Sequence, residues 1–288
     1  MSGAPGQFRR RIKTASLIVL VVGLALVTPW AWRLAGGDDT ALIDLERAER
    51  QLRAAAGLPM SGTPALDRLP QRLAEQGLAA GAPIFIRIFK REFELELWMK
   101  RGDAFQPFAT YPICRWSGTL GPKLAEGDRQ APEGFYTVDK NALNPNSRYY
   151  RSFNLGYPNA YDTSLGRTGS LIMVHGGCAS IGCFAMTDAQ MDEIWRLVTA
   201  ALDGGQKRFQ VQVFPFRMTP ENLKKFEVSP SLAFWRMLKR GNDLFEARLA
   251  PPRVMACAGR YDFEPANPDS AGDAVIEDRC TSASPKNS

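Results

Sequence analysis

Hydrophobic and polar residues alternate over two neighbouring stretches in the first half of the chain, and a period of two is typical of β-strands. The first stretch places Ile84, Ile86 and Ile88 on one face, and the second runs from Phe93 to Met99. The charged residues 90–92 lie between them, so we expect a β-hairpin. The same pattern predicts further strands at residues 105–114, 134–139, 171–175 and 210–216. Residues 83–216 should therefore form a mainly β body.

Two later segments carry apolar residues at helical spacing. Residues 187–190 read Thr-Asp-Ala-Gln, a capping box in which the Thr and Gln side chains satisfy free amides at the start of a helix. Met191, Ile194 and Val198 then fall on one stripe. The sequence predicts a helix over residues 188–201 and a second helical segment over residues 232–238.

The N-terminal segment combines a basic cluster with an uncharged apolar stretch. Arg9, Arg10, Arg11 and Lys13 precede residues 15–32, which contain no charged side chain. This length is at the lower limit for a membrane-spanning helix, and the basic flank would keep the amino end in the cytoplasm. A cleaved signal peptide shares these features. In both interpretations the rest is exported, so we expect a periplasmic protein, either anchored to the inner membrane or secreted after cleavage.

These patterns divide the chain into five expected segments. They are a signal anchor or signal peptide (residues 1–35), a helical stalk and linker (36–82), the catalytic domain (83–217), a helical extension (218–250) and a Pro-rich, loose tail (251–288). The fold class that follows is mainly β with flanking helices (α+β), after an N-terminal membrane anchor.

Composition and charge exclude several classes of protein. The chain has 288 residues, of which 45% are hydrophobic and 23% are charged, as in globular proteins. The formal charge of +6 is modest, and no basic run is interleaved with aromatic residues, so we expect no nucleic-acid partner. No phosphate-loop, nucleotide or flavin motif is present, and we therefore expect no cofactor.

The candidate chemistry is concentrated between His175 and Cys183. His175 is the only histidine of the chain and follows a predicted strand. A thiol needs a neighbouring base to act as a nucleophile at neutral pH, and this histidine is the base available. The amides of Gly182 and Cys183 could stabilise an oxyanion, because glycine has no side chain to block the approach. Ser180 could orient the loop or donate to a substrate. Together these residues predict a cysteine acyl-transfer site.

The residues alone leave other roles open for the cysteines. Cys178 and Cys183 could form a short-loop disulfide, or could bind a metal together with His175, although the chain lacks the paired spacing of structural zinc sites. In an exported protein, five cysteines leave four for two disulfides if Cys183 is a free nucleophile. The segments in which they lie suggest pairing of Cys114 with Cys178 and of Cys257 with Cys280. We expect no metal site.

These residues resemble the catalytic domain of L,D-transpeptidases of the YkuD type, and more closely the YafK-like branch of murein L,D-transpeptidases. The resemblance extends from residue 83 to about residue 245. It rests on His175-Gly176 followed by Ser180-x-Gly182-Cys183, and on the surrounding motifs Gly121–Lys123, Glu126–Asp128, Ala131–Tyr136, Ser147–Tyr150, Gly156–Asp162, Cys183–Thr187 and Pro215–Thr219.

The resemblance implies a fold, a reaction and a set of roles. The fold would be an L,D-transpeptidase-like β-sandwich. Cys183 would be the nucleophile, His175 the base, and the amides of Gly182 and Cys183 the oxyanion donors. The cysteine would attack a carbonyl of a peptidoglycan stem peptide, form a thioester and transfer the acyl group to an amine or to water.

The chain departs from the common family pattern at two positions. Ile181 stands where a second histidine is common, and Ala185 stands where an arginine ordinarily holds a substrate carboxylate. The YafK-like branch shares these departures, and it resembles amidases that release covalently attached protein from peptidoglycan. Hydrolysis is therefore an alternative to transpeptidation. A third hypothesis is a non-catalytic peptidoglycan-binding envelope scaffold.

Other side chains could replace the missing arginine in binding the stem peptide. The candidate substrate-binding residues are Arg115, Lys123, Arg148, Arg151 and Tyr149. The expected partners are peptidoglycan stem peptides, a wall-attached envelope protein in the amidase alternative, and the inner membrane through the N-terminal segment.

Overall fold

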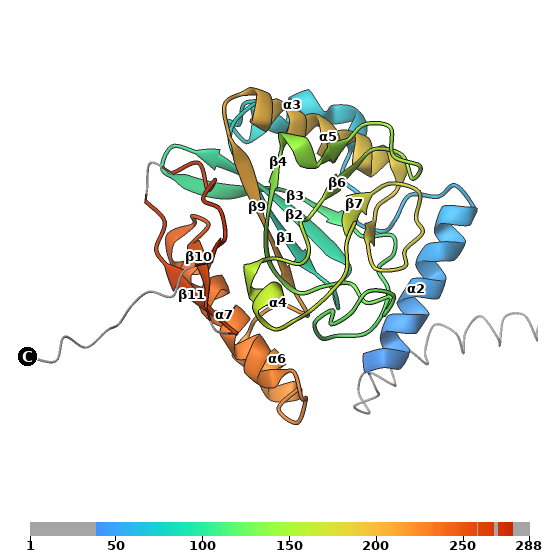
Figure 1. The fold of residues 1–288 in the computed structure, drawn as a ribbon. Coiled ribbons are helices and arrows are strands. Elements are labelled where there is room, and N and C mark those ends of the chain that lie inside the picture. Colours follow the sequence, from blue (N-terminus) through green and yellow to red (C-terminus); the bar gives the residue numbers. More distant parts are fainter. Residues whose placement is uncertain (1–38, 258, 268–269, 279–288) are drawn as a thin grey trace, which may run out of the picture. The chain divides into compact units, whose positions relative to one another are not determined.

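The two alternating stretches form the predicted hairpin, which lies inside a mixed five-stranded sheet (Figure 1). The order of its strands is β3 (Ala104–Pro112), β2 (Glu94–Arg101), β1 (Ile84–Phe89), β9 (Arg208–Phe214) and β4 (Gly134–Asp139). β1 is antiparallel to β2, with Ile84 opposite Met99, and parallel to β9. The remaining neighbours are antiparallel. The hairpin and three further strands predicted from alternation are thus confirmed.

The computed structural model describes residues 39–257, 259–267 and 270–278. The chain divides into two units, Met1–Glu49 and Arg50–Ser288, and each is described by itself. In the described part, no helix is both long and apolar enough to cross a membrane. The apolar segment 15–32, on which the anchor prediction depends, lies outside the described residues.

Both faces of the five-stranded sheet are covered, so every residue of β1 is buried. α7 (Leu232–Arg248) covers one face, where the ring centroids of Phe245 and Phe85 are 4.6 Å apart. α5 (Asp188–Asp203) covers the other face (Figure 1). Tyr111 lies on the same side as the isoleucines of β1, and its hydroxyl donates to Glu193 of α5 at 2.6 Å.

The capping box predicted at the start of α5 is present. Thr187 accepts from the amide of Gln190, and the Gln190 side chain accepts from the Thr187 amide. The second predicted helix is also present as α7, although it extends ten residues past the predicted end at residue 238, to Arg248. The later turns of α7 bury Asn242 and Phe245. Polar residues interrupt the apolar stripe there, so the sequence pattern did not show the full length of the helix.

A second, four-stranded sheet carries the candidate chemistry. Its strands, in order, are β5 (Leu143–Asn144), β6 (Ser152–Asn154), β7 (Met173–His175) and β8 (Phe184–Ala185). β7 and β8 are parallel, with His175 opposite Ala185, and the other pairs are antiparallel. Each strand has only two or three residues, so the geometry of this sheet depends on the loops around it.

The expectation of a loose C-terminal tail is wrong for most of its described part. β10 (Arg253–Cys257), β11 (Arg260–Glu264) and β12 (Glu277–Asp278) form a three-stranded sheet. Tyr261 is buried and stacks on Tyr161, with centroids 4.2 Å apart. Proline and small residues flank these short strands, which explains why composition alone suggested a loose segment.

The remaining helices are short, apart from α2. They are α2 (Asp39–Ala55), α3 (Leu69–Glu75), α4 (Ala160–Ser164) and α6 (Pro220–Lys225), with single 3-10 turns at Leu66–Arg68 and Lys140–Ala142. Residues 50–82, expected as stalk and linker, belong to the second unit. There Arg72 pairs with the buried Glu193 of α5 at 2.8 Å. The described chain is thus a mixed α/β fold with several sheets and helices.

Candidate active site

Cys183 lies immediately before β8, where its thiol meets the backbone of the neighbouring strand. Its Sγ accepts from the amide of Met173 at 3.4 Å and donates to the carbonyl of Leu171 at 3.6 Å. The residue is partly exposed, and it is the free cysteine within the described part of the chain. A half-exposed thiol is accessible to a substrate and is also held in place by the backbone.

His175 lies at the end of β7, on the strand next to Cys183. Its side chain is buried, and Nδ1 is 2.5 Å from the carbonyl oxygen of Gly176. Because a carbonyl can only accept, Nδ1 must carry the hydrogen, and Nε2 is then left with a lone pair. Among the described residues, His175 and Cys183 are not directly hydrogen-bonded to each other. Apo sites often show such a gap before the substrate binds.

Burial keeps both groups neutral in the resting protein. Burial lowers the pKa of His175, and the bond to the Gly176 carbonyl offsets part of that decrease. Burial raises the pKa of the Cys183 thiol, against the Met173 amide and the charge of Lys123, which lower it. The arrangement can support a general-base attack, in which the thiol loses its proton as it reacts, rather than a preformed thiolate–imidazolium pair.

Ser180 and Gly182 shape the turn that leads into Cys183. The Ser180 hydroxyl donates to the carbonyl of Cys183 at 2.7 Å and accepts from the Gly182 amide at 3.3 Å. It also lies 3.2 Å from the Ser117 hydroxyl. Gly182 has φ = +141°, and a Cβ there would come within 3.2 Å of Ile172. In this structure Ser180 therefore orients the loop, and the Gly182 amide is occupied by Ser180.

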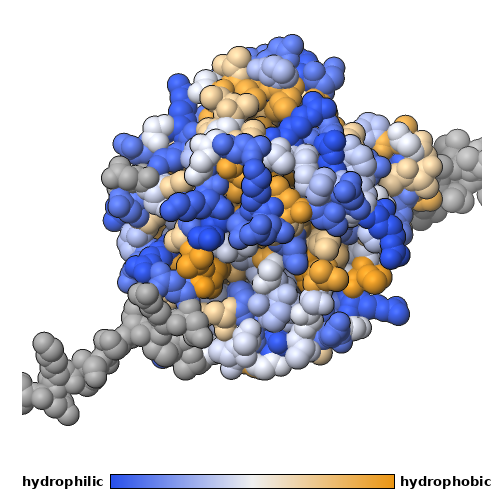
Figure 2. Space-filling model, turned by 45° about the horizontal axis from the view of Figure 1, so that its top comes forward, coloured by the Kyte–Doolittle hydropathy of each residue, from blue (hydrophilic) through white to orange (hydrophobic). Residues whose placement is uncertain are grey.

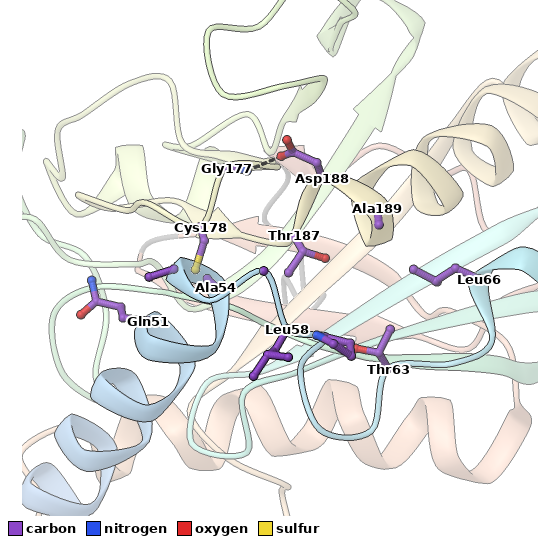
Figure 3. Close-up of a pocket in the computed structure, with 13 residues that line it drawn as sticks. Gln51, Ala54, Leu58, Thr63, Leu66, Gly177, Cys178, Thr187, Asp188 and Ala189 are labelled. Carbon is purple, nitrogen blue, oxygen red and sulfur yellow. Dashed lines mark hydrogen bonds between the residues drawn. The ribbon is translucent and has the colours of Figure 1, made fainter.

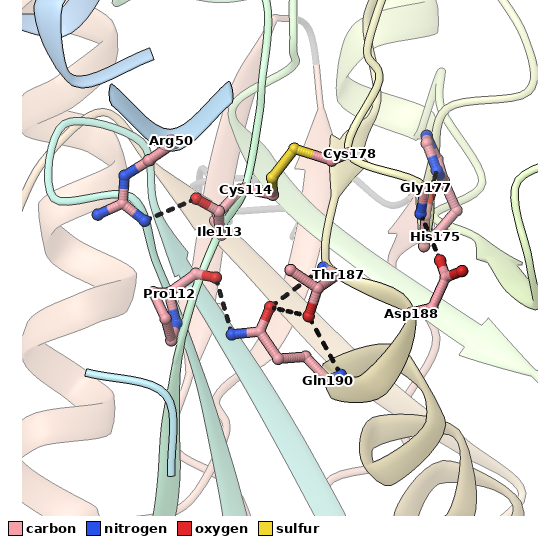
Figure 4. The surroundings of a disulfide bond; sticks show 11 residues. Arg50, Pro112, Ile113, Cys114, His175, Gly177, Cys178, Thr187, Asp188 and Gln190 are labelled. Atoms are coloured by element: carbon pink, nitrogen blue, oxygen red, sulfur yellow. Dashed lines mark hydrogen bonds between the residues drawn. A yellow bond between two sulfur atoms is a disulfide. The ribbon is translucent and has the colours of Figure 1, made fainter. Parts of the chain in front are cut away.

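A disulfide joins Cys114 to Cys178, three residues after His175 (Figure 4). The predicted pairing of these two cysteines is confirmed, and the alternative disulfide between Cys178 and Cys183 is wrong. Cys280 and the side chain of Cys257 lie outside what the structure describes. No group of three or more histidine, cysteine or acidic side chains that could hold a metal occurs among the described residues.

Two of the four candidate cations are already paired. Lys123 is buried, where it pairs with Asp128 at 2.5 Å and donates to the Ala125 carbonyl at 2.8 Å. Arg151 pairs with Asp192 of α5 at 2.6 Å. Both side chains therefore form salt bridges within the protein in the absence of a substrate.

The other two candidate cations form no salt bridge within the described residues. The backbone of Arg115 exchanges two hydrogen bonds with Ala185, at 2.8 and 3.0 Å, so the two residues lie directly opposite each other. Arg148 lies 6.0 Å from the centre of the Tyr149 ring. Tyr149 itself lies against the imidazole of His175.

Two sets of contacts, one of them at the candidate site, were not picked out from the sequence. Asp188 accepts from the Gly177 amide at 2.8 Å and so holds the turn after His175 (Figure 4). Lys90 and Glu133 form a fully buried pair at 2.8 Å, and Glu133 also accepts from the Gly121 amide. Alternation identified the hairpin around Lys90, but no local signal links a hairpin lysine to a carboxylate 43 residues away.

An apolar cavity of about 840 Å³ lies beside the disulfide rather than at Cys183. Cys178, Ala54, Leu58 and Leu66 are among the residues that line this cavity, and Figure 3 labels them. Elsewhere apolar side chains reach the surface in separate patches, as on the face drawn in Figure 2. Near the candidate site, Leu171 and Ile181 are strongly exposed.

The fold and the site place the chain in a known class. The YkuD family, the L,D-transpeptidase catalytic domain, matches residues 85–215. The chain is 46% identical over 205 residues to YafK of Escherichia coli (strain K12), covering 71% of this chain and 81% of that protein. YafK of Escherichia coli O157:H7 gives the same values. The chain therefore belongs to the L,D-transpeptidase family, which acts on peptidoglycan stem peptides.

The chain is also similar to a solved structure, at a lower level. This is the helical cell shape determining protein Pgp2 from Campylobacter jejuni, at 20% identity and a TM-score of 0.38. The match covers 61% of this chain and 65% of that chain.

Proposed function

We propose that the chain is an exported, membrane-anchored cysteine enzyme that acts on peptidoglycan stem peptides through a thioester at Cys183. The main observation behind this proposal is a free, partly exposed thiol immediately before β8, the strand that pairs with β7, where His175 has a neutral imidazole with an unprotonated Nε2. Membership of the L,D-transpeptidase family supplies the substrate class. The apolar segment 15–32 supports export and anchoring in the membrane.

The proposed reaction needs only the side chains of His175 and Cys183. Nε2 of His175 takes the proton of Cys183 as Sγ attacks a stem carbonyl, and an S–C bond forms. The tetrahedral intermediate collapses to a thioester when the C–N bond breaks, and the protonated imidazole gives its proton to the leaving amine. An acceptor amine or water then attacks the thioester and gives a proton to Nε2 of His175. The C–S bond breaks, Sγ takes back that proton, and the product is a new amide or a carboxylic acid.

Arg115 is the cation best placed to bind a carboxylate of the stem. It lies directly opposite Ala185, and side chains of directly opposed residues emerge on the same face of a sheet. Within the described residues its guanidinium forms no salt bridge. We expect Arg115→Gln to raise KM about tenfold, since a charge-assisted hydrogen bond contributes about 1.5 kcal/mol or more. Arg236→Gln, at an exposed position of α7, is the matched control. An unchanged KM in Arg115→Gln would reject this role.

Hydrolysis is a second candidate reaction, and a specific feature favours it. Ile181 and Ala185 are apolar, so neither position offers the polar side chain that is common in the family. In this second candidate reaction the donor is a stem to which an envelope protein is attached, and water completes the reaction. Release of that protein would be the amidase activity.

The test is to trap and identify the acyl group on Cys183. The purified full chain is incubated with muropeptides and, separately, with protein-linked sacculi, and the peptide containing Cys183 is analysed by mass spectrometry. An acyl adduct with new cross-links supports transfer, whereas an adduct with released protein or shortened stems supports hydrolysis. Cys183→Ala is the control. No adduct and no turnover on either substrate would reject the enzyme and favour a binding scaffold.

A further inference from the structure

One aromatic ring lies directly on the imidazole of His175. The ring centroids of Tyr149 and His175 are 5.1 Å apart, and their planes are inclined by 32°. This distance is in the range of offset aromatic pairs. His175 is 3% exposed and Tyr149 is 43% exposed, so Tyr149 forms the outer cover of a buried imidazole.

The backbone around Tyr149 is fitted to the turn that follows His175. The Gly176 amide donates to the Tyr150 carbonyl at 3.3 Å. A Cβ at Gly176 would lie 3.1 Å from Cβ of Tyr150 and 3.2 Å from the Tyr149 carbonyl oxygen. A glycine at position 176 therefore allows these two segments to touch, and the Tyr149 ring is part of this close packing.

α5 holds both segments through two carboxylates. Asp192 accepts from the Tyr150 hydroxyl at 3.0 Å and pairs with Arg151 at 2.6 Å. Asp188 accepts from the Gly177 amide at 2.8 Å. Residues four apart share one face of a helix, so a single face of α5 positions the segment that carries Tyr149 and the turn that follows His175.

We propose that Tyr149 is a positioning residue for His175. Its ring, anchored to α5 through its neighbours, keeps the imidazole in the orientation in which Nδ1–H donates to Gly176 and Nε2 is free. Without the ring, the imidazole could rotate about its side-chain bonds and exchange tautomers. The role in turnover rests on the proposed function, in which His175 is the base, but the ring orientation is a property of the resting protein.

The single histidine of the chain makes this orientation measurable. Protein labelled with ¹⁵N-histidine gives one pair of ring nitrogen signals, whose chemical shifts report which nitrogen carries the proton. At pH 8, we expect one Nδ1–H tautomer in the wild type and in Tyr149→Phe, and a mixture of tautomers in Tyr149→Ala. The neighbouring charged groups Asp188 and Arg148 are retained in all three proteins.

Kinetics provide the second readout. We expect Tyr149→Ala to lower kcat about tenfold or more and to change KM less than twofold, because misplacing the base affects the chemical step. Tyr149→Phe should restore the wild-type kcat. Val228→Ala, at a strongly exposed position, is the control for a surface truncation. Asp192→Asn should shift the tautomer signals in the same direction as Tyr149→Ala, but less.

Three results would overturn the proposal. They are a wild-type tautomer spectrum in Tyr149→Ala, an unchanged kcat in that variant, and a Tyr149→Phe variant as impaired as Tyr149→Ala. Absence of turnover by the wild type, together with the expected tautomer spectra, would instead reject the proposed function and leave the positioning role in place.

Discussion

The five-stranded and four-stranded sheets are built in different ways. β1 contributes six consecutive buried residues and is covered by a helix on each face. β7 and β8 have three and two residues, and a disulfide, Asp188 and Ser180 hold their connecting loops. Apolar burial over long strands therefore maintains the first sheet. The second also buries Phe153, Val174 and Phe184, but its short strands depend in addition on individual polar and covalent contacts. The candidate site lies in the second sheet, where single side chains can set geometry.

The largest expected effect is a loss of turnover without a matching loss of stability. We expect Cys183→Ser to reduce turnover roughly a thousandfold or more, because a hydroxyl is a much weaker nucleophile than a thiol at neutral pH. The substitution removes one partly exposed sulfur, so the free energy of unfolding in urea should change by less than about 1 kcal/mol.

Phe85→Ala is the converse control in the five-stranded sheet. Removing this buried ring should cost about 3–5 kcal/mol of stability, while the protein that remains folded keeps its turnover number. If Cys183→Ser destabilised the protein as much as Phe85→Ala, the separation between the two sheets would be wrong.

The next effect concerns the covalent link of the small sheet. The disulfide closes a loop with a sequence separation of 64, and chain entropy then predicts about 4 kcal/mol of stabilisation. We expect the double variant Cys114→Ala/Cys178→Ala to lose roughly this amount in urea unfolding. Its turnover should also fall, because Cys178 lies in the turn after His175.

The matched control for the disulfide is Cys257→Ala/Cys280→Ala under reducing conditions, compared with the same variant without reductant, because reduction then breaks only the Cys114–Cys178 bond. Equal losses in both would attribute the effect to the link. A double variant as stable and as active as the wild type would show that the short strands maintain the site unaided.

The buried salt bridge between Lys90 and Glu133 tests how much a charged contact contributes to the stability of the large sheet. Lys90 and Glu133 are both fully buried, and Lys90 also donates to the carbonyls of Gly121 and Ala131. Lys90→Met leaves the Glu133 carboxylate buried without its partner, which should cost about 3 kcal/mol in thermal or urea unfolding. Lys90→Met/Glu133→Gln should recover part of the loss. No recovery would mean that the backbone contacts of Lys90 outweigh the ion pair.

The sequence predicted the large sheet better than the small one, for a physical reason. Long alternating runs such as Ile84–Ile88 predict a strand, because apolar residues recur at every second position over many residues. β5, β6 and β8 are too short to show a period. The site residues His175 and Cys183 were identified by their chemistry, and the motif context identified the family. Contacts from distant segments, such as Tyr149 on His175, leave no mark in local sequence.

The pH dependence of turnover gives the smallest and most specific effect. Burial lowers the pKa of His175 below its ordinary value of 6.5 and raises that of Cys183 above its ordinary value of 9.0. Turnover should therefore fall about tenfold per pH unit only below the lowered pKa of His175, where the protonated imidazole can no longer accept the thiol proton.

The free energy of unfolding should decrease with falling pH, as turnover does. The unfolded chain binds a proton at His175 more readily than the folded protein, so stability is lost as pH falls from about 6.5 through the lowered folded pKa, and this contribution is complete above 6.5. The measurement is kcat/KM against pH, alongside the ¹⁵N signals of the single histidine. An acid limb at or above 6.5 would contradict the lowered pKa of His175. A preformed thiolate–imidazolium pair would instead keep turnover at low pH and lose it at high pH, where the imidazolium deprotonates. Burial also raises the pKa of the Glu92 and Asp162 carboxyls, so the ¹⁵N signals of the single histidine are what assign this limb to His175.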